Sequence, residues 1–232
     1  MTAIKDSAEL KRLFDTGAHF AQVKARRHPS MKPFLVGTKG RQEIIDLEKT
    51  NGQLEAAKGA MTTLAKEGKV VLFVGGKIEV SAIVKKAATD MNAPYVATRW
   101  LGGTISNWVE IKKRIDRLAE LEDTSAAGAM SKQHTKLELV KMDREKKRLQ
   151  ERLDGITTLA KRPDALLVVD TKHEKYAVKE AREAGIPIIA LMSSDGNLKD
   201  ASYPIVANDA SRETVKLVLT DLVEAFKKGQ VA

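Results

Sequence analysis

The sequence predicts an α/β protein in which helices cover both faces of a parallel sheet and a helical hairpin is inserted into the chain. Continuous aliphatic runs, typical of strands buried on both faces, occupy residues 69–76, 164–170 and 186–192. Amphipathic helical segments alternate with these runs, at residues 77–91, 173–185 and 211–226. Strands that alternate with helices favour an open three-layer αβα sandwich.

Each predicted helix also carries local signals. The first starts after the Gly-Gly-Lys of residues 75–77 and carries Ile78 on its apolar face. The second carries Tyr176 in its apolar rows and ends at Gly185, a residue suited to the left-handed conformation of a helix end. The third starts at Ser211, which is a good N-cap. Two further short strands are expected at residues 94–98 and 203–208.

The segment 105–156 interrupts this alternation, because it shows helical periodicity without a strand pattern. Apolar residues recur there at steps of three and four, at Trp108, Ile111, Ile115 and Leu118, and again at Leu139, Met142, Leu149, Leu153 and Ile156, with Lys146 in the second seam. The polar segment 122–132 between the two seams predicts a turn. We therefore expect a protruding coiled-coil hairpin over residues 105–156 and a sandwich domain made of residues 1–104 and 157–232.

The charge of the chain favours a polyanionic partner. The formal net charge is +9, and the excess cation lies in residues 1–162, which hold 31 Lys and Arg against 20 Asp and Glu. Residues 163–232 hold 9 against 11. A one-sided basic surface lowers the energy of phosphate binding and releases counterions. A basic protein without such a partner is the alternative.

Several function classes are disfavoured by composition. The chain has no cysteine, which excludes disulfides, thiolate nucleophiles and cysteine-based zinc sites. Its four histidines have no metal-binding spacing, so no metal is expected. It has no apolar stretch long enough for a membrane span, and its first residues carry charge where a signal peptide needs an apolar run. A cytoplasmic protein without a membrane partner is expected.

The densest basic run lies at residues 23–42, among prolines and glycines and with no acid before Glu43. We interpret it as irregular, extended chain that lays cationic side chains along a phosphate backbone. A disordered basic loop is the alternative, although Phe34, Leu35 and Val36 are suited to anchoring the segment on a core.

Two strand ends invite an enzymatic hypothesis. Gly75, Gly76 and Lys77 stand where α/β folds bind phosphates, but they lack the spacing of a phosphate-binding loop, and Ile78 replaces the Ser or Thr that would hold magnesium. A tight turn with a phosphate-contacting Lys77 is the preferred interpretation, and a nucleotide-binding enzyme is the runner-up. Asp170 and His173 follow a strand without a nucleophile or paired carboxylates, so catalysis is disfavoured.

Taken in order, the motifs resemble successive blocks of one family over residues 8–226. These are "GAHF", "MKPFLVG", "EIIDLEKT", "KVVLFVGGK", "TRWLGGTISNW", "RPDALLVVDTKHEKYAVKEAREAGIPIIAL" and "ANDASRETVKLVLTDLVEAF". The family is bacterial small-subunit ribosomal protein S2. The resemblance implies a flavodoxin-like, Rossmann-like sandwich with an inserted hairpin, in a non-enzymatic protein that needs no cofactor. It also implies binding to small-subunit ribosomal RNA at the head–body junction, beside neighbouring small-subunit proteins, and a part in docking the large RNA-binding protein S1.

On this resemblance, Gly102 and Gly103 turn the chain into the first arm of the hairpin. Trp100 and Trp108 are expected to pack the base of the hairpin on the sandwich, while Arg99 and Asn107 stand at the rim. Base stacking by the tryptophans is the alternative, and a protein–protein adaptor working through the hairpin is a third functional hypothesis.

Three parts of the sequence depart from the family pattern. Residues 21–23 are Ala-Gln-Val where the family has Gly-His-Gln, Ala207 replaces a glycine, and the loop 192–200 lacks the usual Asp-Thr-Asn. Contacts made by those family residues are therefore not expected here. We expect phosphate and shape recognition of RNA rather than sequence readout, and no DNA partner. The candidate RNA-binding residues are Lys24, Arg26, Arg27, Lys32, Lys39, Arg41, Lys77, Arg99, Asn107, Lys112 and Lys113.

Overall fold

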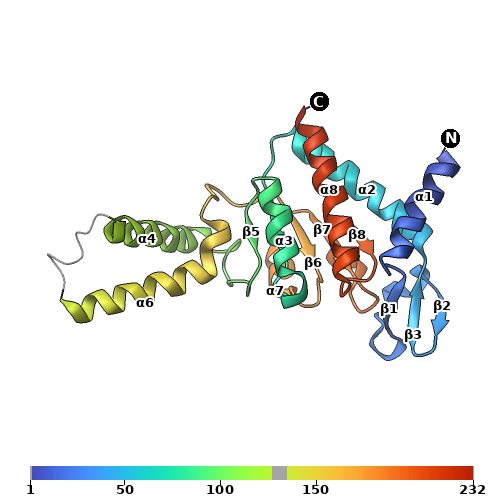
Figure 1. Cartoon of the computed structure of the whole chain (residues 1–232), viewed down its shortest axis with the longest axis horizontal. Helices are drawn as coiled ribbons and strands as arrows, with labels where there is room; N and C mark the ends of the chain where they lie inside the picture. Colours follow the sequence, from blue (N-terminus) through green and yellow to red (C-terminus); the bar gives the residue numbers. More distant parts are fainter. Residues whose placement is uncertain (1, 127–134, 232) are drawn as a thin grey trace.

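The computed structural model describes residues 2–126 and 135–231 of the chain. The molecule is elongated, with a helical hairpin at one end of a central sandwich and a small three-stranded sheet at the other (Figure 1). The two chain ends lie on the same side of the sandwich. The hairpin and the small sheet therefore lie at opposite ends of the long axis of the molecule.

The described chain forms two sheets and a set of flanking helices. The strands are β1 (Phe20–Val23), β2 (Leu35–Lys39), β3 (Gln42–Ile45), β4 (Val71–Val74), β5 (Tyr95–Val96), β6 (Ala165–Val169), β7 (Ile188–Met192) and β8 (Tyr203–Val206). The α-helices are α1 (Thr2–Asp15), α2 (Leu47–Lys66), α3 (Ile78–Asp90), α4 (Trp108–Ala126), α6 (Lys136–Leu153), α7 (Lys175–Glu183) and α8 (Arg212–Val231). Short 3-10 helices are η1 (Lys24–Arg26), η2 (Pro29–Phe34), η3 (Asp154–Ile156) and η4 (Leu198–Asp200).

The larger sheet is parallel throughout, with the strand order β5-β4-β6-β7-β8. Numbered in chain order within this sheet, the strands run 2-1-3-4-5, which is the flavodoxin-like arrangement. Its central strands are buried at every position, because helices lie on both faces. The predicted α/β sandwich with a parallel sheet and an inserted helical hairpin is thus confirmed.

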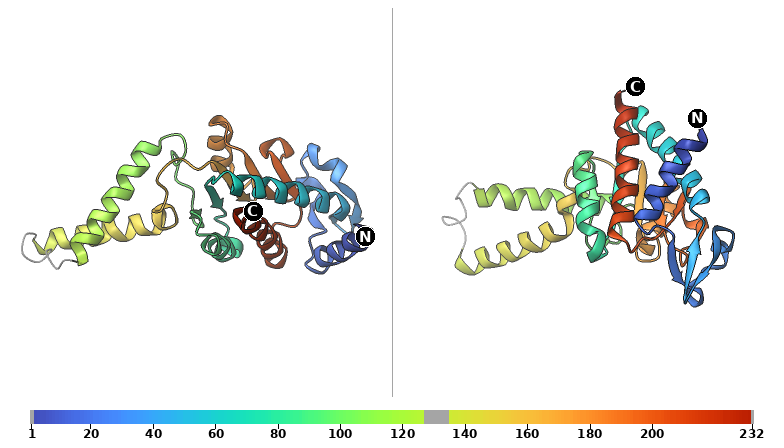
Figure 2. Two further views of the ribbon diagram at one scale, coloured as in Figure 1. Left: turned by 90° about the horizontal axis from the view of Figure 1, so that it is seen from above. Right: turned by 45° about the vertical axis from the view of Figure 1, so that its right-hand side comes forward.

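Two hydrophobic clusters form the two sides of the core. Val71 and Phe73 of β4 point toward α2, α3 and α8, whereas Leu72 and Val74 of the same strand point toward α7 and the base of the hairpin. Alternation along a strand sends successive side chains to opposite faces. Figure 2 shows the helices on either side of the large sheet.

The pair α2 and α8 covers one face of the sheet. Asp46 caps α2 by accepting hydrogen bonds from the amides of Glu48 and Lys49. Near the other end of α2, a Cβ on Gly229 of α8 would lie 2.6 Å from the carbonyl oxygen of Thr62. Only glycine allows the two helices to approach this closely.

The predicted strands and helices of the sandwich are present, with two differences in which side chains face the core. Ile78, expected on the apolar face of α3, is 89% exposed, and the buried residues of that helix include Val80 and Val84. Tyr176, expected in the apolar rows of α7, is 61% exposed. Both residues lie in the first turn of their helices, at the carboxyl ends of the central strands, where the helix starts face solvent.

The segment 23–42 differs from the prediction of irregular, extended chain. It forms 3-10 turns and antiparallel strands, with β3 paired between β1 and β2. Alternation over residues 42–45 is short, which is why the pattern was missed: Glu43 and Ile45 are buried and their neighbours are not. Ala207, where the family has glycine, has no positive φ, so no left-handed turn forms there.

The hairpin consists of α4 and α6, which pack side by side (Figures 1 and 2). Both predicted seams face the partner helix, and Leu121 extends the first one. Thr135 and Glu138 form a reciprocal capping box at the start of α6. The turn predicted at 122–132 is corrected at its start, because α4 continues to Ala126; residues 127–132 lie outside the described part of the chain.

Candidate nucleic-acid interface

The small sheet presents five of the predicted RNA-binding cations to solvent. Lys24 and Arg26 lie on η1, Lys32 lies on η2, and Lys39 and Arg41 flank the tip of the β2–β3 hairpin. That tip is Gly40, whose φ of 64° suits glycine. None of the five forms an ion pair with any residue in the part of the chain that the structure describes. Their charge is therefore available to a phosphate backbone.

The basic sheet is held rigidly on the sandwich. The amide of His28 donates to the carbonyl oxygen of Ser194 at 2.8 Å, and the amide of Gln22 donates to the Ser194 hydroxyl at 3.1 Å. On the apolar side, Met31 and Ile45 are buried in the cluster that lies under the large sheet. A surface held by buried contacts loses less conformational entropy on binding than a disordered basic loop.

Arg27 differs from its basic neighbours because it has an internal partner. Its guanidinium Nη1 lies 2.8 Å from Oε1 of Glu43, whose side chain is almost fully buried on β3. Removing the arginine would leave a buried carboxylate without its counterion, which is costly. Arg27 thus stabilises the sheet and is not a free cation.

Lys77 also has internal partners. Its ammonium pairs with Asp170 at the end of β6 and lies 3.8 Å from the carboxylate of Asp209. Burial lowers the pKa of Lys77, but Asp209 and Asp170 outweigh it and the pKa is raised. Burial raises the pKa of Asp209 to about 7, with repulsion from Asp170 in the same direction and Lys77 opposing it. The Lys77 ammonium lies closer to Asp170 than to Asp209, so its charge offsets only part of the rise that burial causes in the Asp209 pKa.

The structure gives the Gly-Gly-Lys turn a packing role. The amide of Gly76 donates to Oε1 of Glu174 at 2.8 Å, and a Cβ at this position would lie 2.3 Å from the carbonyl oxygen of Thr98. The groups that would hold a nucleotide's phosphate are therefore already paired, namely this amide and the Lys77 ammonium. This disfavours the runner-up hypothesis of a nucleotide-binding enzyme at the turn.

The loop that enters the hairpin, residues 98–108, is organised by Glu180 of α7. Its carboxylate accepts hydrogen bonds from the Trp100 indole at 3.1 Å and the Gly103 amide at 2.8 Å. The amides of Ile105 and Ser106, and the Ser106 hydroxyl, donate to the other oxygen. Burial opposes ionisation of Glu180, but these hydrogen bonds outweigh it and the pKa of the carboxyl is lowered.

Glu180 was not recognised as functional from the sequence, although a signal existed. It lies in the row of α7 that also holds Ala177 and Ala181, both fully buried. A carboxylate in such a row must find several donors within reach, and a Gly-Gly loop with free amides supplies them. Trp100 and Trp108 are buried at the base of the hairpin, as expected for packing residues.

The other end of the hairpin base is joined to the sandwich by a second polar contact. The hydroxyl of Tyr95 donates to Asp154 at 3.0 Å, and Lys85 of α3 lies 3.4 Å from the same carboxylate oxygen. Gly155 fits directly against β5, because a Cβ there would lie 2.1 Å from the Tyr95 carbonyl oxygen. Arg99 and Asn107 are exposed at this base.

On the hairpin, basic side chains have acidic neighbours. Lys113 lies 2.7 Å from Glu110, and Lys147 lies 2.8 Å from Asp143. Arg117 contacts Glu120 at 3.1 Å and Glu145 of the opposite helix at 3.6 Å. Lys112 is exposed without an ion pair among the described residues. These pairs are typical of a solvated coiled-coil face.

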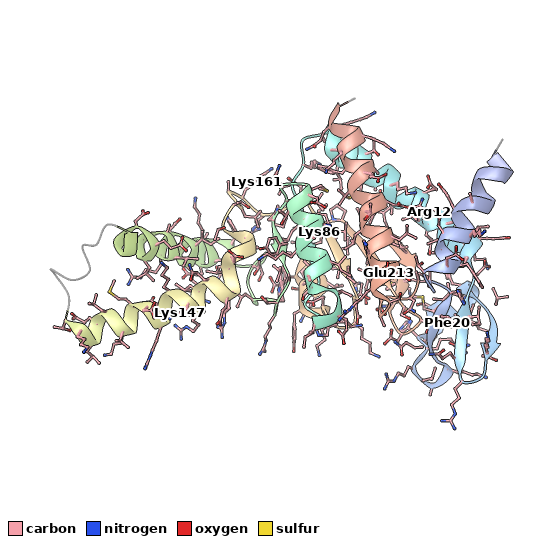
Figure 3. The ribbon with its side chains drawn as sticks, in the orientation of Figure 1. Arg12, Phe20, Lys86, Lys147, Lys161 and Glu213 are labelled. Atoms are coloured by element: carbon pink, nitrogen blue, oxygen red, sulfur yellow. The ribbon has the colours of Figure 1, made fainter. Side chains whose placement is uncertain are left out.

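The structure does not bring all predicted site residues together. Five cations lie on the small sheet, whereas Lys112 and Lys113 lie on the hairpin at the opposite end, with Arg99 and Asn107 between them. Figure 3 labels Phe20 on the sheet and Lys147 on the hairpin at the two ends of the molecule. The predicted residues therefore form at least two separate surfaces.

The sequence that forms these elements matches a known family over most of its length. The family profile of Ribosomal protein S2 matches residues 13–229. The chain belongs to the ribosomal protein S2 family. Small ribosomal subunit protein uS2 of Kocuria rhizophila is 36% identical over 220 residues, covering 95% of this chain and 77% of that protein.

Other members of the S2 family match over the same extent. The uS2c protein of Rhodomonas salina is 37% identical over 220 residues, which is 95% of this chain and 90% of the relative. The uS2 protein of Wolinella succinogenes is 37% identical over 221 residues, which is 95% of this chain and 81% of the relative. Family membership makes this chain a structural ribosomal protein of the small subunit, with a role in translation.

Two further findings bear on other kinds of site. Among residues 2–126 and 135–231, no group of three or more His, Asp or Glu side chains has the geometry to hold a metal ion. No helix in this described part is long and apolar enough to cross a membrane.

Proposed function

We propose that this S2-family chain binds small-subunit ribosomal RNA through phosphate contacts made by the small basic sheet. The observation that carries the proposal is the set of five exposed cations with no ion pair among the described residues, on a sheet anchored by buried contacts. Arg and Lys side chains on an ordered scaffold suit phosphate oxygens, and they fix orientation rather than read sequence.

The family resemblance extends this proposal. The chain would lie at the head–body junction on the solvent side of the subunit, in contact with neighbouring small-subunit proteins. It would also help to dock the large RNA-binding protein S1, as a non-enzymatic component of the cytoplasmic ribosome. Sedimentation of tagged chain in a lysate of its own cells tests the assembly: co-migration with small subunits, weakened by high salt, is expected.

The RNA contact is tested by measuring affinity for a small-subunit ribosomal RNA transcript over a range of salt concentrations. Replacing Arg26, Lys32 and Arg41 together with alanine is expected to weaken binding and to make the negative slope of log affinity against log salt shallower by about 2–3, because three phosphate contacts are lost. Unchanged melting temperature would show that the sheet still folds.

A matched control removes the same charge from the other side of the sandwich. Lys216, Lys227 and Lys228 are exposed on α8, and their replacement with alanine is expected to leave the slope nearly unchanged. Equal losses of slope in the two triple variants would contradict the proposal, since net charge rather than the sheet would then determine binding. Salt-independent binding of the unaltered chain would overturn the phosphate mechanism itself.

A further inference from the structure

A cavity of about 760 Å³ opens at the carboxyl ends of β4 and β6. These two strands are the point at which the strand order of the large sheet reverses, where open α/β folds bind their ligands. We call it the switch-point cavity; its walls include Lys77, Ile78, Arg99, Trp100, Glu174 and Tyr176. Its lining is mainly apolar, and an apolar hollow that stays open to solvent commonly marks a binding site.

Tyr176 supplies an exposed aromatic ring to the wall of this cavity. Its side chain is 61% exposed, although α7 has buried positions that an aromatic residue could occupy. The ammonium of Lys175 lies 5.1 Å from the centroid of its ring. A cation near one face leaves the opposite face for a planar group, and bases stack on such rings whatever their sequence.

Among the described residues, the charged groups at the cavity divide into a paired set and an unpaired set, and the unpaired set holds one acid, Glu79, besides Arg99. Lys77 and Glu174 are committed to partners inside the protein. Arg99 is exposed and forms no ion pair or hydrogen bond with any described residue. Its position on the rim suits a phosphate that lies outside the cavity rather than in it.

We propose that the switch-point cavity receives one unpaired base of single-stranded RNA, which stacks on Tyr176 while Arg99 contacts the adjoining phosphate. The inference rests on the proposed RNA-binding function and adds to it a base contact far from the basic sheet. Stacked, unpaired nucleotides are the usual means by which proteins hold single-stranded RNA.

The local charges favour a base within a chain over a free mononucleotide. A terminal phosphate carries two negative charges and needs free donors, but the Gly76 amide donates to Glu174 and the Lys77 ammonium pairs with Asp170. The cavity therefore suits the base of a nucleotide, while the phosphate stays outside it. An apolar peptide side chain would also fit by shape, but it would leave Arg99 and Lys175 without an anionic partner.

The test compares four variants by their affinity for a small-subunit ribosomal RNA transcript across salt. Tyr176→Ala is expected to weaken binding roughly 5- to 100-fold, with the salt slope unchanged because no phosphate contact is lost. Tyr176→Phe keeps the ring and is expected to bind within twofold of the unaltered chain. Tyr176→Leu keeps an apolar group without a ring and is expected to behave like Tyr176→Ala. Tyr203→Ala, at an exposed tyrosine on β8, is the matched control.

Each other outcome has a definite meaning. Equal binding by Tyr176→Ala and the unaltered chain would overturn the inference while leaving the sheet proposal intact. Equal binding by Tyr176→Leu and Tyr176→Phe would also overturn it, because an apolar peptide or packing site needs no ring. Failure of the unaltered chain to bind the transcript would overturn both proposals.

A second arm locates the contact. Irradiation of the chain with transcript containing 5-iodouridine, which crosslinks to stacked aromatic rings, is expected to label the peptide that contains Tyr176. Label confined to other peptides would contradict the stacking contact. Millimolar AMP is expected not to raise the melting temperature; a clear rise would assign the cavity to a free nucleotide instead.

Discussion

The small sheet and the hairpin are both rich in Lys and Arg, but their charges differ in availability. On the sheet, Lys24, Arg26 and Lys32 have no ion pair among the described residues. On the hairpin, Lys113 and Lys147 each lie within 3 Å of a carboxylate oxygen one turn away. Acids spaced three or four residues from a base neutralise it locally. The number of basic residues therefore indicates how much charge is available to a polyanion less well than the absence of acidic neighbours does.

The two regions are also attached differently. The sheet is held by several contacts spread over Ser194, Met31 and Ile45, whereas five hydrogen bonds at the base of the hairpin converge on the single carboxylate of Glu180. Removing Glu180 takes away the centre of this polar network, while the buried tryptophans and the Tyr95–Asp154 contact remain at the hairpin base. A distributed attachment tolerates single substitutions better.

The largest effect is expected from Glu180→Ala. It leaves the amides of Gly103 and Ile105 and the Trp100 indole without their acceptor, so the free energy of unfolding is expected to fall by about 3 kcal/mol. For a chain of this size the melting temperature falls by roughly 6–12 °C. Thermal denaturation measures the loss, and Glu180→Gln, which keeps one acceptor oxygen, is expected to lose less.

The same variant separates the two regions. Hydrogen exchange is expected to quicken over residues 100–106 and to stay unchanged over the small sheet, at a temperature where the chain is folded. Faster exchange over both regions to the same extent would show that they unfold as one unit. The contrast in attachment would then be wrong.

A smaller effect, dependent on pH, is expected at Asp209, which lies beside the paired Lys77. Burial raises the pKa of Asp209 to about 7, so the folded chain holds a proton that the unfolded chain releases near pH 4. The free energy of unfolding therefore falls as pH rises from about 4 to about 7, and the neutral form is the stabilising one. Asp209→Asn lacks this fall.

Urea denaturation at pH 5 and pH 8 measures the difference. Relative to the unaltered chain, Asp209→Asn is expected to gain about 2 kcal/mol between the two conditions. Asp116→Asn, at an exposed carboxylate on α4, is the control and should show no such change. A constant offset between Asp209→Asn and the unaltered chain would show that the Asp209 pKa is not raised.

The smallest effect is expected when Lys113 and Lys147 on the hairpin lose their acidic partners. Glu110→Gln with Asp143→Asn removes the partners of Lys113 and Lys147, and is expected to make the negative slope of log RNA affinity against log salt steeper by about 1, with a few-fold gain in affinity. The converse variant, Lys113→Ala with Lys147→Ala, is expected to change the slope little. A loss as large as that of the sheet triple variant would show that pairing does not decide which cations bind RNA.

Much of the sandwich could be predicted because its signals are local. The runs that became β4, β6 and β7 are apolar throughout, and the heptad seams of α4 and α6 are evident from spacing alone. The small sheet was missed because its strands are four or five residues long and lie among prolines and glycines. Such short strands gain stability only once they are paired, as β2 is with its neighbour β3 and β3 is with the earlier β1, and periodicity does not report pairing.

The candidate site was predicted less completely than the fold. Residue type and local density predicted Lys24, Arg26 and Lys32, together with Arg27 and Lys77, as RNA-binding residues. The structure exposes the first three and gives Arg27 and Lys77 internal partners, and RNA contact by any of them stays a prediction. The partner of Arg27 is 16 residues away in the sequence, and Asp170 is on another strand. Pairing at such separations depends on the strand order, which a single sequence does not state.

The sequence by itself determined the fold class, the hairpin and the excess of positive charge, because burial on two faces, heptad spacing and composition are properties of short windows. Only the tertiary structure decided which cations remain free, that Glu180 holds the hairpin, and that Tyr176 lies open at the switch-point cavity. The physical reason is that the charge state and exposure of a side chain depend on its neighbours in space, and those neighbours come from distant parts of the chain.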